Sequence, residues 1–169
     1  MVEEFLNYLQ YELRRSPETV ESYRCDLGHF EVFFKDLNDH LDWETIDSDV
    51  IRDWMESMIE KGNKATSVSR RLSAVRSLYR FALAHRLVEQ DPAHNIEAPK
   101  KNKPLPQFLK EDEINRLLDD DMWEDTYKDV RARTIIMTFY ETGMRLSELT
   151  GLDEKSIDFT ENHLKVTGK

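Results

Sequence analysis

KATSVSRRLSAVRSLYRFALAHR, residues 64–86, is the stretch of this sequence that decides its fold. Apolar side chains recur along it at steps of three and four, the spacing that places them on one face of an α-helix. The pattern predicts a helix from about Thr66 to Arg86. Its buried stripe would consist of Val68, Leu72, Val75, Leu78, Tyr79, Ala82 and Leu83.

Three further amphipathic helices are predicted N-terminal to this stretch. The first lies near residues 2–14 and carries apolar residues at helical spacing. The second begins at Ser16, a good N-cap, with Pro17 at the first helical position. Asp47 or Ser48 caps the third. Because four such helices can enclose a core, the sequence predicts a helical domain.

Residues 91–106 contain four of the five prolines and hardly any apolar periodicity. Proline disfavours helix at its own position and at the one before it, so we expect an extended linker here. The predicted organisation is a helical domain over residues 1–90, a Pro/Lys-rich linker over 91–106 and a second unit over 107–169.

The second unit is predicted to combine helices with a short hairpin. Thr142-Gly143 is a helix stop, and Thr160-Glu161-Asn162 is a polar turn between apolar residues. The expected elements are a short helix with Ile114, Leu117 and Leu118, a longer helix from about Tyr127 to Glu141, a helical turn at about Arg145 to Leu149, and a two-stranded hairpin with Ile157, Phe159, Leu164 and Val166.

Composition excludes several classes of protein. With 39% hydrophobic and 34% charged residues, the 169-residue chain fits a soluble, helix-rich globular class and not a collagen-like or low-complexity one. Its apolar stretches fall far short of the roughly 20 residues that a membrane-spanning helix needs, and its acidic start does not resemble a signal peptide. Cys25 is the single cysteine, which excludes an internal disulfide and a CxxC metal site. We expect a cytoplasmic protein.

The net charge of -10 is unevenly distributed along the chain. Residues 61–110 carry 11 Lys/Arg and 3 Asp/Glu, whereas residues 1–60 carry 5 and 16, and residues 111–169 carry 8 and 15. A basic block between two acidic ones can attract a polyanion locally even on an acidic protein. The charge pattern alone fits a solvated helix face equally well.

The polar side of the stretch 64–86 has the composition of a DNA contact. Hydroxyl residues at a helix N-terminus, with arginines one turn on, suit phosphate and base-edge contacts. An arginine fork can read guanine edges, whereas lysines and hydroxyls mainly anchor the backbone. The candidate DNA-binding residues are Lys64, Thr66, Ser67, Arg70, Arg71 and Arg76, with Ser73 and Arg80 beside them, and Lys100, Lys101 and Lys103 of the linker.

A second polar group lies in the stretch Thr142-Gly143-Met144-Arg145-Leu146-Ser147-Glu148-Leu149-Thr150-Gly151-Leu152. The arginine follows the glycine stop closely, and the glutamate comes three residues later on the same face of a new helical turn. Glu148 could therefore hold the Arg145 guanidinium while its remaining donors face a ligand. The same pattern also fits a structural Arg–Glu pair in a loop.

Thr142 to Leu152 resembles the first active-site box of the tyrosine recombinases, the lambda-integrase family, and is most similar to its Xer-type members. Ser16 to Leu27 resembles the second helix of that family, and Lys64 to Phe81 its DNA-contacting fourth helix. The other matching segments are 91–93, 104–106 and 109–118. The resemblance implies a mainly α fold: a four-helix SAM-like core-binding domain followed by the truncated start of an α+β catalytic domain.

The resemblance also implies roles for three residues. Arg145 matches the first catalytic arginine, which binds the scissile phosphate, and Glu148 matches the acidic residue that supports it. Lys169 matches the catalytic lysine of a hairpin turn, which donates a proton to the leaving 5′ oxygen. Phosphoryl transfer from a diester needs both functions: clamped oxygens and a proton for the departing alkoxide.

The sequence departs from the family pattern in one respect. The pattern also includes a His-x-x-Arg box, another His or Trp and a tyrosine nucleophile, whereas all six tyrosines here precede Arg145. We therefore expect an incomplete catalytic domain. The 169-residue chain would bind DNA without catalysing, while a full-length parent would be a DNA strand-exchange enzyme.

The activity implied by the resemblance is site-specific recombination through a 3′-phosphotyrosine, without metal or nucleotide cofactor. The implied partners are a duplex DNA recombination site and other recombinase subunits, four to a synapse, with no membrane. Chromosome-dimer resolution and integration of a mobile element both stay open. Two other hypotheses remain: a noncatalytic DNA-binding module that competes for a recombination site, and a helical protein-interaction domain without DNA affinity.

Overall fold

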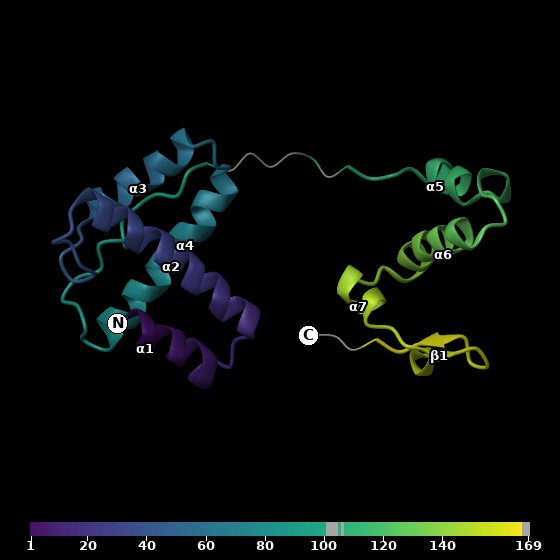
Figure 1. Ribbon diagram of the computed structural model, residues 1–169, viewed down its shortest axis with the longest axis horizontal. Helices are drawn as coiled ribbons and strands as arrows, with labels where there is room; N and C mark the ends of the chain where they lie inside the picture. Colours follow the sequence, from purple (N-terminus) through teal and green to yellow (C-terminus); the bar gives the residue numbers. More distant parts are fainter. Residues whose placement is uncertain (101–104, 106, 167–169) are drawn as a thin grey trace. The chain divides into compact units, whose positions relative to one another are not determined.

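The computed structural model describes residues 1–100, 105 and 107–166. The chain divides into two compact units, Met1–Pro104 and Leu105–Lys169 (Figure 1). Each unit is described by itself below.

The first unit is a bundle of helices. Its elements are α1 (Val2–Asn7), a π-helical turn η1 (Tyr8–Glu12), α2 (Pro17–Leu37), α3 (Ser48–Glu60) and α4 (Ala65–Ala84). The four predicted helices are confirmed, although the first changes to π-helical geometry after Asn7. The predicted caps are present: Ser16 Oγ accepts a hydrogen bond from the Thr19 backbone N–H at 3.4 Å, and Asp47 Oδ1 caps α3.

The core of this unit lies where α2 crosses α4 (Figure 1). Phe30 and Phe34 of α2 are completely buried, and the Phe30 ring centroid lies 4.6 Å from that of Trp54 on α3. On α4, the Tyr79 hydroxyl donates a hydrogen bond to the Trp43 carbonyl at 3.0 Å. Burial, followed by the charges of Asp91 and Asp42, raises the pKa of this hydroxyl, which keeps it a donor.

The prediction of an extended linker from Asp91 is wrong for its first six residues. Ala93 and Ile96 are buried in the core of the first unit, 0% and 4% exposed. Asp91 Oδ1 accepts the Ala93 backbone N–H at 2.8 Å, which forms a turn. Arg76 of α4 donates to the carbonyls of Ala93, at 3.4 Å, and Ile96. Apolar burial and these hydrogen bonds compensate for the proline at position 92.

The second unit contains helices and one small sheet. Its elements are α5 (Glu111–Leu118), a 3₁₀ turn η2 (Asp120–Met122), α6 (Tyr127–Thr142), α7 (Leu146–Thr150), a 3₁₀ turn η3 (Glu154–Ser156), β1 (Ile157–Asp158) and β2 (His163–Leu164). The predicted hairpin is confirmed as an antiparallel pair in which Ile157 lies opposite Leu164. The predicted stop at Gly143 is confirmed by its left-handed backbone, φ 63°.

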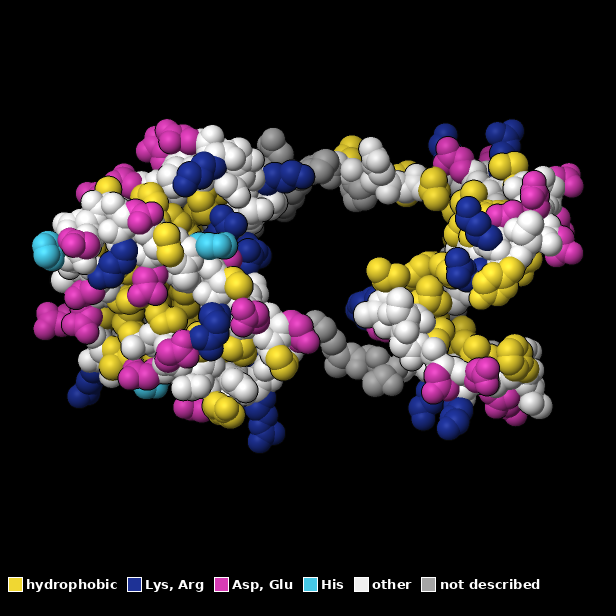
Figure 2. All heavy atoms as spheres, viewed as in Figure 1, with side chains coloured by type: hydrophobic (Ala, Val, Ile, Leu, Met, Phe, Trp, Pro, Cys, Tyr) yellow, Lys and Arg dark blue, Asp and Glu magenta, His cyan; other side chains and the backbone are white. Residues whose placement is uncertain are grey.

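This unit has little buried apolar surface. Among its described residues, Ile114 is the one buried hydrophobic side chain, whereas Tyr127 is 80% and Phe159 85% exposed. Figure 2 shows apolar side chains gathered on its visible surface. Arg133 of α6 holds α5 in place by donating two hydrogen bonds to the Leu118 carbonyl, at 3.0 and 2.7 Å. These two hydrogen bonds connect α6 to the C-terminal end of α5.

No helix in the part of the chain that the structure describes combines the length and apolar character needed to cross a membrane.

Candidate functional site

The first candidate site begins at the N-terminus of α4. Lys64 is the N-cap residue and is exposed, and its carbonyl accepts the backbone N–H groups of Ser67 and Val68 at 2.8 and 3.1 Å. The first helical turn therefore starts with Ala65, and it carries the hydroxyls of Thr66, which is exposed, and Ser67, which is half-buried. A lysine and two hydroxyls at a helix start can anchor a phosphate.

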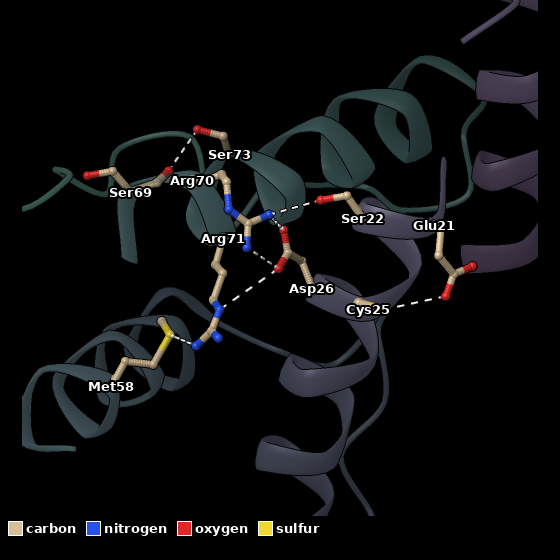
Figure 3. A network of polar contacts seen from close by, with 9 residues as sticks. All are labelled: Glu21, Ser22, Cys25, Asp26, Met58, Ser69, Arg70, Arg71 and Ser73. Atoms are coloured by element: carbon tan, nitrogen blue, oxygen red, sulfur yellow. Dashed lines mark hydrogen bonds and ion pairs between the residues drawn. The ribbon is translucent and has the colours of Figure 1, made fainter. Parts of the chain in front are cut away.

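Arg70 lies one turn further along α4 and is bound to α2 (Figure 3). Its Nη2 donates to Asp26 Oδ1 at 2.8 Å, and its Nη1 donates to Asp26 Oδ2 and, at 3.1 Å, to Ser22 Oγ. The Arg70 side chain is 54% exposed, whereas that of Asp26 is 6% exposed. A buried carboxylate therefore holds a half-exposed guanidinium by two parallel bonds.

Arg71 follows a different course from its neighbour (Figure 3). Its Nε lies 3.8 Å from Asp26 Oδ1, and its Nη1 contacts Met58 Sδ of α3 at 3.3 Å. The side chain is 23% exposed, so it is mostly buried between helices. The two arginines and the one carboxylate form a cluster with one surplus positive charge.

The remaining candidates lie further along the chain. Arg76 is half-buried and bonds the carbonyls of Ala93 and Ile96, so the structure does not place it beside Arg70 and Asp26. Lys100 is exposed, whereas Lys101 and Lys103 lie outside the described residues. The other polar positions on α4 have local bonds: Ser73 Oγ donates to the Ser69 carbonyl at 2.8 Å, and Arg80 Nε to the Arg76 carbonyl at 3.4 Å.

The Cys25 thiol lies beside this cluster on α2 (Figure 3). It donates to Glu21 Oε1 at 3.5 Å. This hydrogen bond and the charge of Glu21 raise the pKa of the thiol. A protonated thiol is a poor nucleophile, so Cys25 is not an activated group of the site.

The second candidate site joins α6 to α7. Gly143 ends α6, and Arg145 is the N-cap residue of α7. Glu148 binds Arg145 twice: its Oε2 accepts the Arg145 backbone N–H at 2.7 Å, and its Oε1 accepts Nη1–H at 2.9 Å. The Arg145 side chain is 80% exposed while that of Glu148 is 12% exposed. The predicted ion pair is thus present, and the guanidinium projects into solvent.

The charge on Glu148 is stabilised by these bonds. The backbone N–H of Arg145, then its side-chain hydrogen bond and its positive charge, hold the pKa of the Glu148 carboxyl below its ordinary value. Glu148 therefore stays ionised near neutral pH and keeps Arg145 oriented. Such a fixed guanidinium can bind a nonbridging phosphate oxygen. Lys169 lies outside the described residues.

Sequence reasoning missed Asp26 and Ser22 as parts of the first site. The signal that could have found Asp26 is its position beside Leu27, within the apolar stripe of the second predicted helix. A carboxylate in such a stripe is buried, and a buried carboxylate needs a cationic partner. That partner is Arg70, which lies 44 residues further along the chain on a different helix.

Two family models match this chain, one in each unit. The model described as the phage integrase N-terminal SAM-like domain matches residues 2–86, and that of the phage integrase family matches residues 107–169. Tyrosine recombinase XerD of Oceanobacillus iheyensis is 30% identical over 168 residues, which cover 99% of this chain and 56% of that protein. Tyrosine recombinase XerC of Lactobacillus delbrueckii subsp. bulgaricus is 36% identical over 169 residues, which cover 99% of this chain and 56% of that protein. The chain spans about half the length of the curated relatives it matches.

Solved structures share the fold. The Tn1549 transposon integrase, in complex with circular intermediate DNA, superposes with a TM-score of 0.71 at 15% identity, covering 94% of this chain and 50% of that one. The integrase from mycobacterium phage Brujita superposes with a TM-score of 0.54 at 21% identity, covering 100% of this chain and 54% of that one. These likenesses extend across both units of the chain.

Proposed function

Because this chain belongs to the phage integrase family, the tyrosine recombinases, we propose that the protein acts in site-specific recombination of duplex DNA. In this proposal the first unit binds the duplex and the second supplies part of the site that holds the scissile phosphate. The reaction cuts and rejoins DNA strands through a 3′-phosphotyrosine, in assemblies with other recombinase subunits. We place it in the cytoplasm, where bacterial DNA is found.

The observation that carries the proposal is the Arg145–Glu148 pair. Glu148 accepts one hydrogen bond from the Arg145 backbone N–H and one from its guanidinium, and the Arg145 side chain is nevertheless 80% exposed. Cleavage of a phosphodiester builds negative charge on the phosphoryl oxygens, and a preoriented guanidinium stabilises that charge without reorganising. Arg145 would take this role, Glu148 would support it, and Lys169 would protonate the leaving 5′ oxygen.

The DNA-binding part of the proposal rests on α4. Lys64, Thr66, Ser67 and Arg70 follow one another along its first two turns, in the stretch 61–110 that holds 11 of the 24 basic residues. We also assign five further residues to the DNA-binding region. Arg71 and Arg76 would fix the shape of this region, and Lys100, Lys101 and Lys103 would contact the DNA. A noncatalytic DNA-binding module would account for residues 2–86 and leave the match over 107–169 without a role.

Titration of labelled duplex DNA at several salt concentrations tests the proposal. The 169-residue chain should bind, with an affinity that falls steeply as salt rises, because phosphate contacts release counterions. Lys64→Ala should weaken binding to all sequences and reduce the salt slope by about 1. The matched control is Arg52→Ala, which removes one exposed positive charge from α3. The absence of binding at low ionic strength would refute the proposal.

A further inference from the structure

Asp26 is the one buried charged residue in the described part of the chain, 4% exposed. It lies on α2 and faces α4, where Arg70 and Arg71 both point at its carboxylate (Figure 3). An isolated carboxylate would be costly to bury, so a cationic partner is required. Arg71 already lies within 3.8 Å and is mostly buried. Arg71 supplies charge to the Asp26 carboxylate but donates no hydrogen bond to it, because its buried Nε has no hydrogen-bond partner.

Arg70 takes both carboxylate oxygens. A guanidinium has five N–H donors in a fixed plane, and Arg70 directs three of them at Asp26 and Ser22, all from its two Nη atoms. Among the described residues, Arg70 Nε donates no hydrogen bond. The N–H of Nε and the second N–H of Nη2 point the same way and form a second fork.

This geometry separates the two edges of the guanidinium. The end formed by Nη1 and Nη2 is closed by the buried carboxylate, and Ser22 fixes its rotation. The side formed by Nε and Nη2 belongs to a side chain that is 54% exposed. A planar fork whose other edge is anchored loses little conformational freedom when it binds a pair of acceptors.

We propose that Asp26 is a positioning residue which fixes Arg70 so that its Nε/Nη2 fork binds a pair of acceptors on duplex DNA. The inference rests on the proposed DNA-binding function and deepens it. Two acceptor pairs on a duplex have the required spacing: two oxygens of one backbone phosphate, and O6 and N7 of a guanine. The arms of the test below distinguish these two sources.

The test is a double-mutant cycle between Asp26 and Arg70, read as the dissociation constant for labelled duplex DNA. Arg70→Lys keeps the charge and removes the fork, so it should weaken binding roughly tenfold. Asp26→Asn removes the anchoring charge and should weaken binding by about threefold to tenfold, since one of two charge-assisted bonds is lost. In an Arg70→Ala background, Asp26→Asn should have no further effect, because its action passes through Arg70.

Controls separate this role from folding. Thermal unfolding of each variant identifies a temperature at which all are folded, and binding is measured there. Ser22→Ala is a milder variant at an exposed position that removes one of the three bonds, and it should weaken binding about twofold. Arg52→Ala removes an exposed positive charge from α3 and should leave the fork unchanged.

Each outcome decides the inference. Equal losses on two duplexes of unrelated sequence support it with phosphate as the acceptor, and losses confined to one sequence support it with guanine. If folded Asp26→Asn or folded Arg70→Lys binds like the unaltered chain, or if Asp26→Asn weakens binding equally in the Arg70→Ala background, the inference is overturned. Failure of the unaltered chain to bind any duplex would instead overturn the proposed function.

Discussion

Substitution of Arg76 by alanine tests whether the segment after α4 belongs to the first unit. Arg76 donates to the carbonyls of Ala93 and Ile96, and both of these residues are buried. Arg76→Ala leaves the two carbonyls without these donors, so the hydrogen bonds between α4 and the turn at 91–96 are lost. We expect a loss of stability concentrated in this turn.

The magnitude follows from the contacts. A hydrogen bond from a charged donor contributes about 1.5 to 3 kcal/mol, and one of the two bonds here is long at 3.4 Å. Because the Arg76 side chain is half-buried, we expect Arg76→Ala to lower the free energy of unfolding by about 2 kcal/mol. For a unit of this size, that corresponds to a fall in Tm of about 10 °C.

Calorimetry and hydrogen exchange measure this effect globally and locally. The Ala93 backbone N–H, which now donates to Asp91 Oδ1, should exchange about 30 times faster in the variant if the turn opens by itself. Arg80→Ala is the matched control, since it removes the same charge one turn along α4, where the side chain is exposed, and it should change stability by less than about 0.5 kcal/mol.

If Arg76→Ala and Arg80→Ala unfolded at the same temperature and exchange at Ala93 were unchanged, the two carbonyl bonds would not hold the turn. If Arg76→Ala weakened DNA binding at full stability, its guanidinium would be a direct DNA contact.

Two further predictions concern the second unit. Limited proteolysis should cut first between residues 97 and 106 or within the last 20 or so residues, leaving the first unit intact through Ile96. The reason is that Ile114 is the one buried hydrophobic side chain among the described residues beyond Leu105. Mass spectrometry would identify the fragments, and a more resistant second unit would contradict this prediction. The pKa of Glu148 in the folded protein lies below its ordinary value of 4.5. Its bonds to Arg145 therefore contribute their full share to folding stability above pH 4.5, and this contribution is lost as the pH falls through the folded pKa. A carboxyl titration by NMR should show this lowered value, and Arg145→Ala should return it toward 4.5.

Local sequence signals predicted the helices and the Arg145–Glu148 pair well. The α2 cap at Ser16, the α6 stop at Gly143 and the ion pair at a spacing of three all depend on residues within one or two helical turns. Their geometry is set by the backbone conformation of a single element. Such features can be predicted without knowing what packs against them.

The turn at 91–96 and the Asp26 cluster could not be predicted in this way. Two apolar residues, Ala93 and Ile96, are too few to establish a period among prolines and polar residues. Asp26 and Arg70 are 44 residues apart, and they meet because α2 and α4 cross. Tertiary packing determined these features, and it assigned three similar arginines to three different environments.

Helical geometry explains that division among the arginines of α4. Successive residues turn by about 100° around a helix, so Arg71 points about 100° away from Arg70, and Arg76 about 120° away on the other side. Thr66, Ser67 and Ser73 fall within about 60° of Arg70. Arg71 is accordingly mostly buried, against Met58, and Arg76 is half-buried, against the turn at 91–96. Thr66, Arg70 and Ser73 are exposed. A DNA duplex that meets α4 on its Arg70 side would therefore contact hydroxyls and one fixed guanidinium, and the two flanking arginines would hold that surface in place.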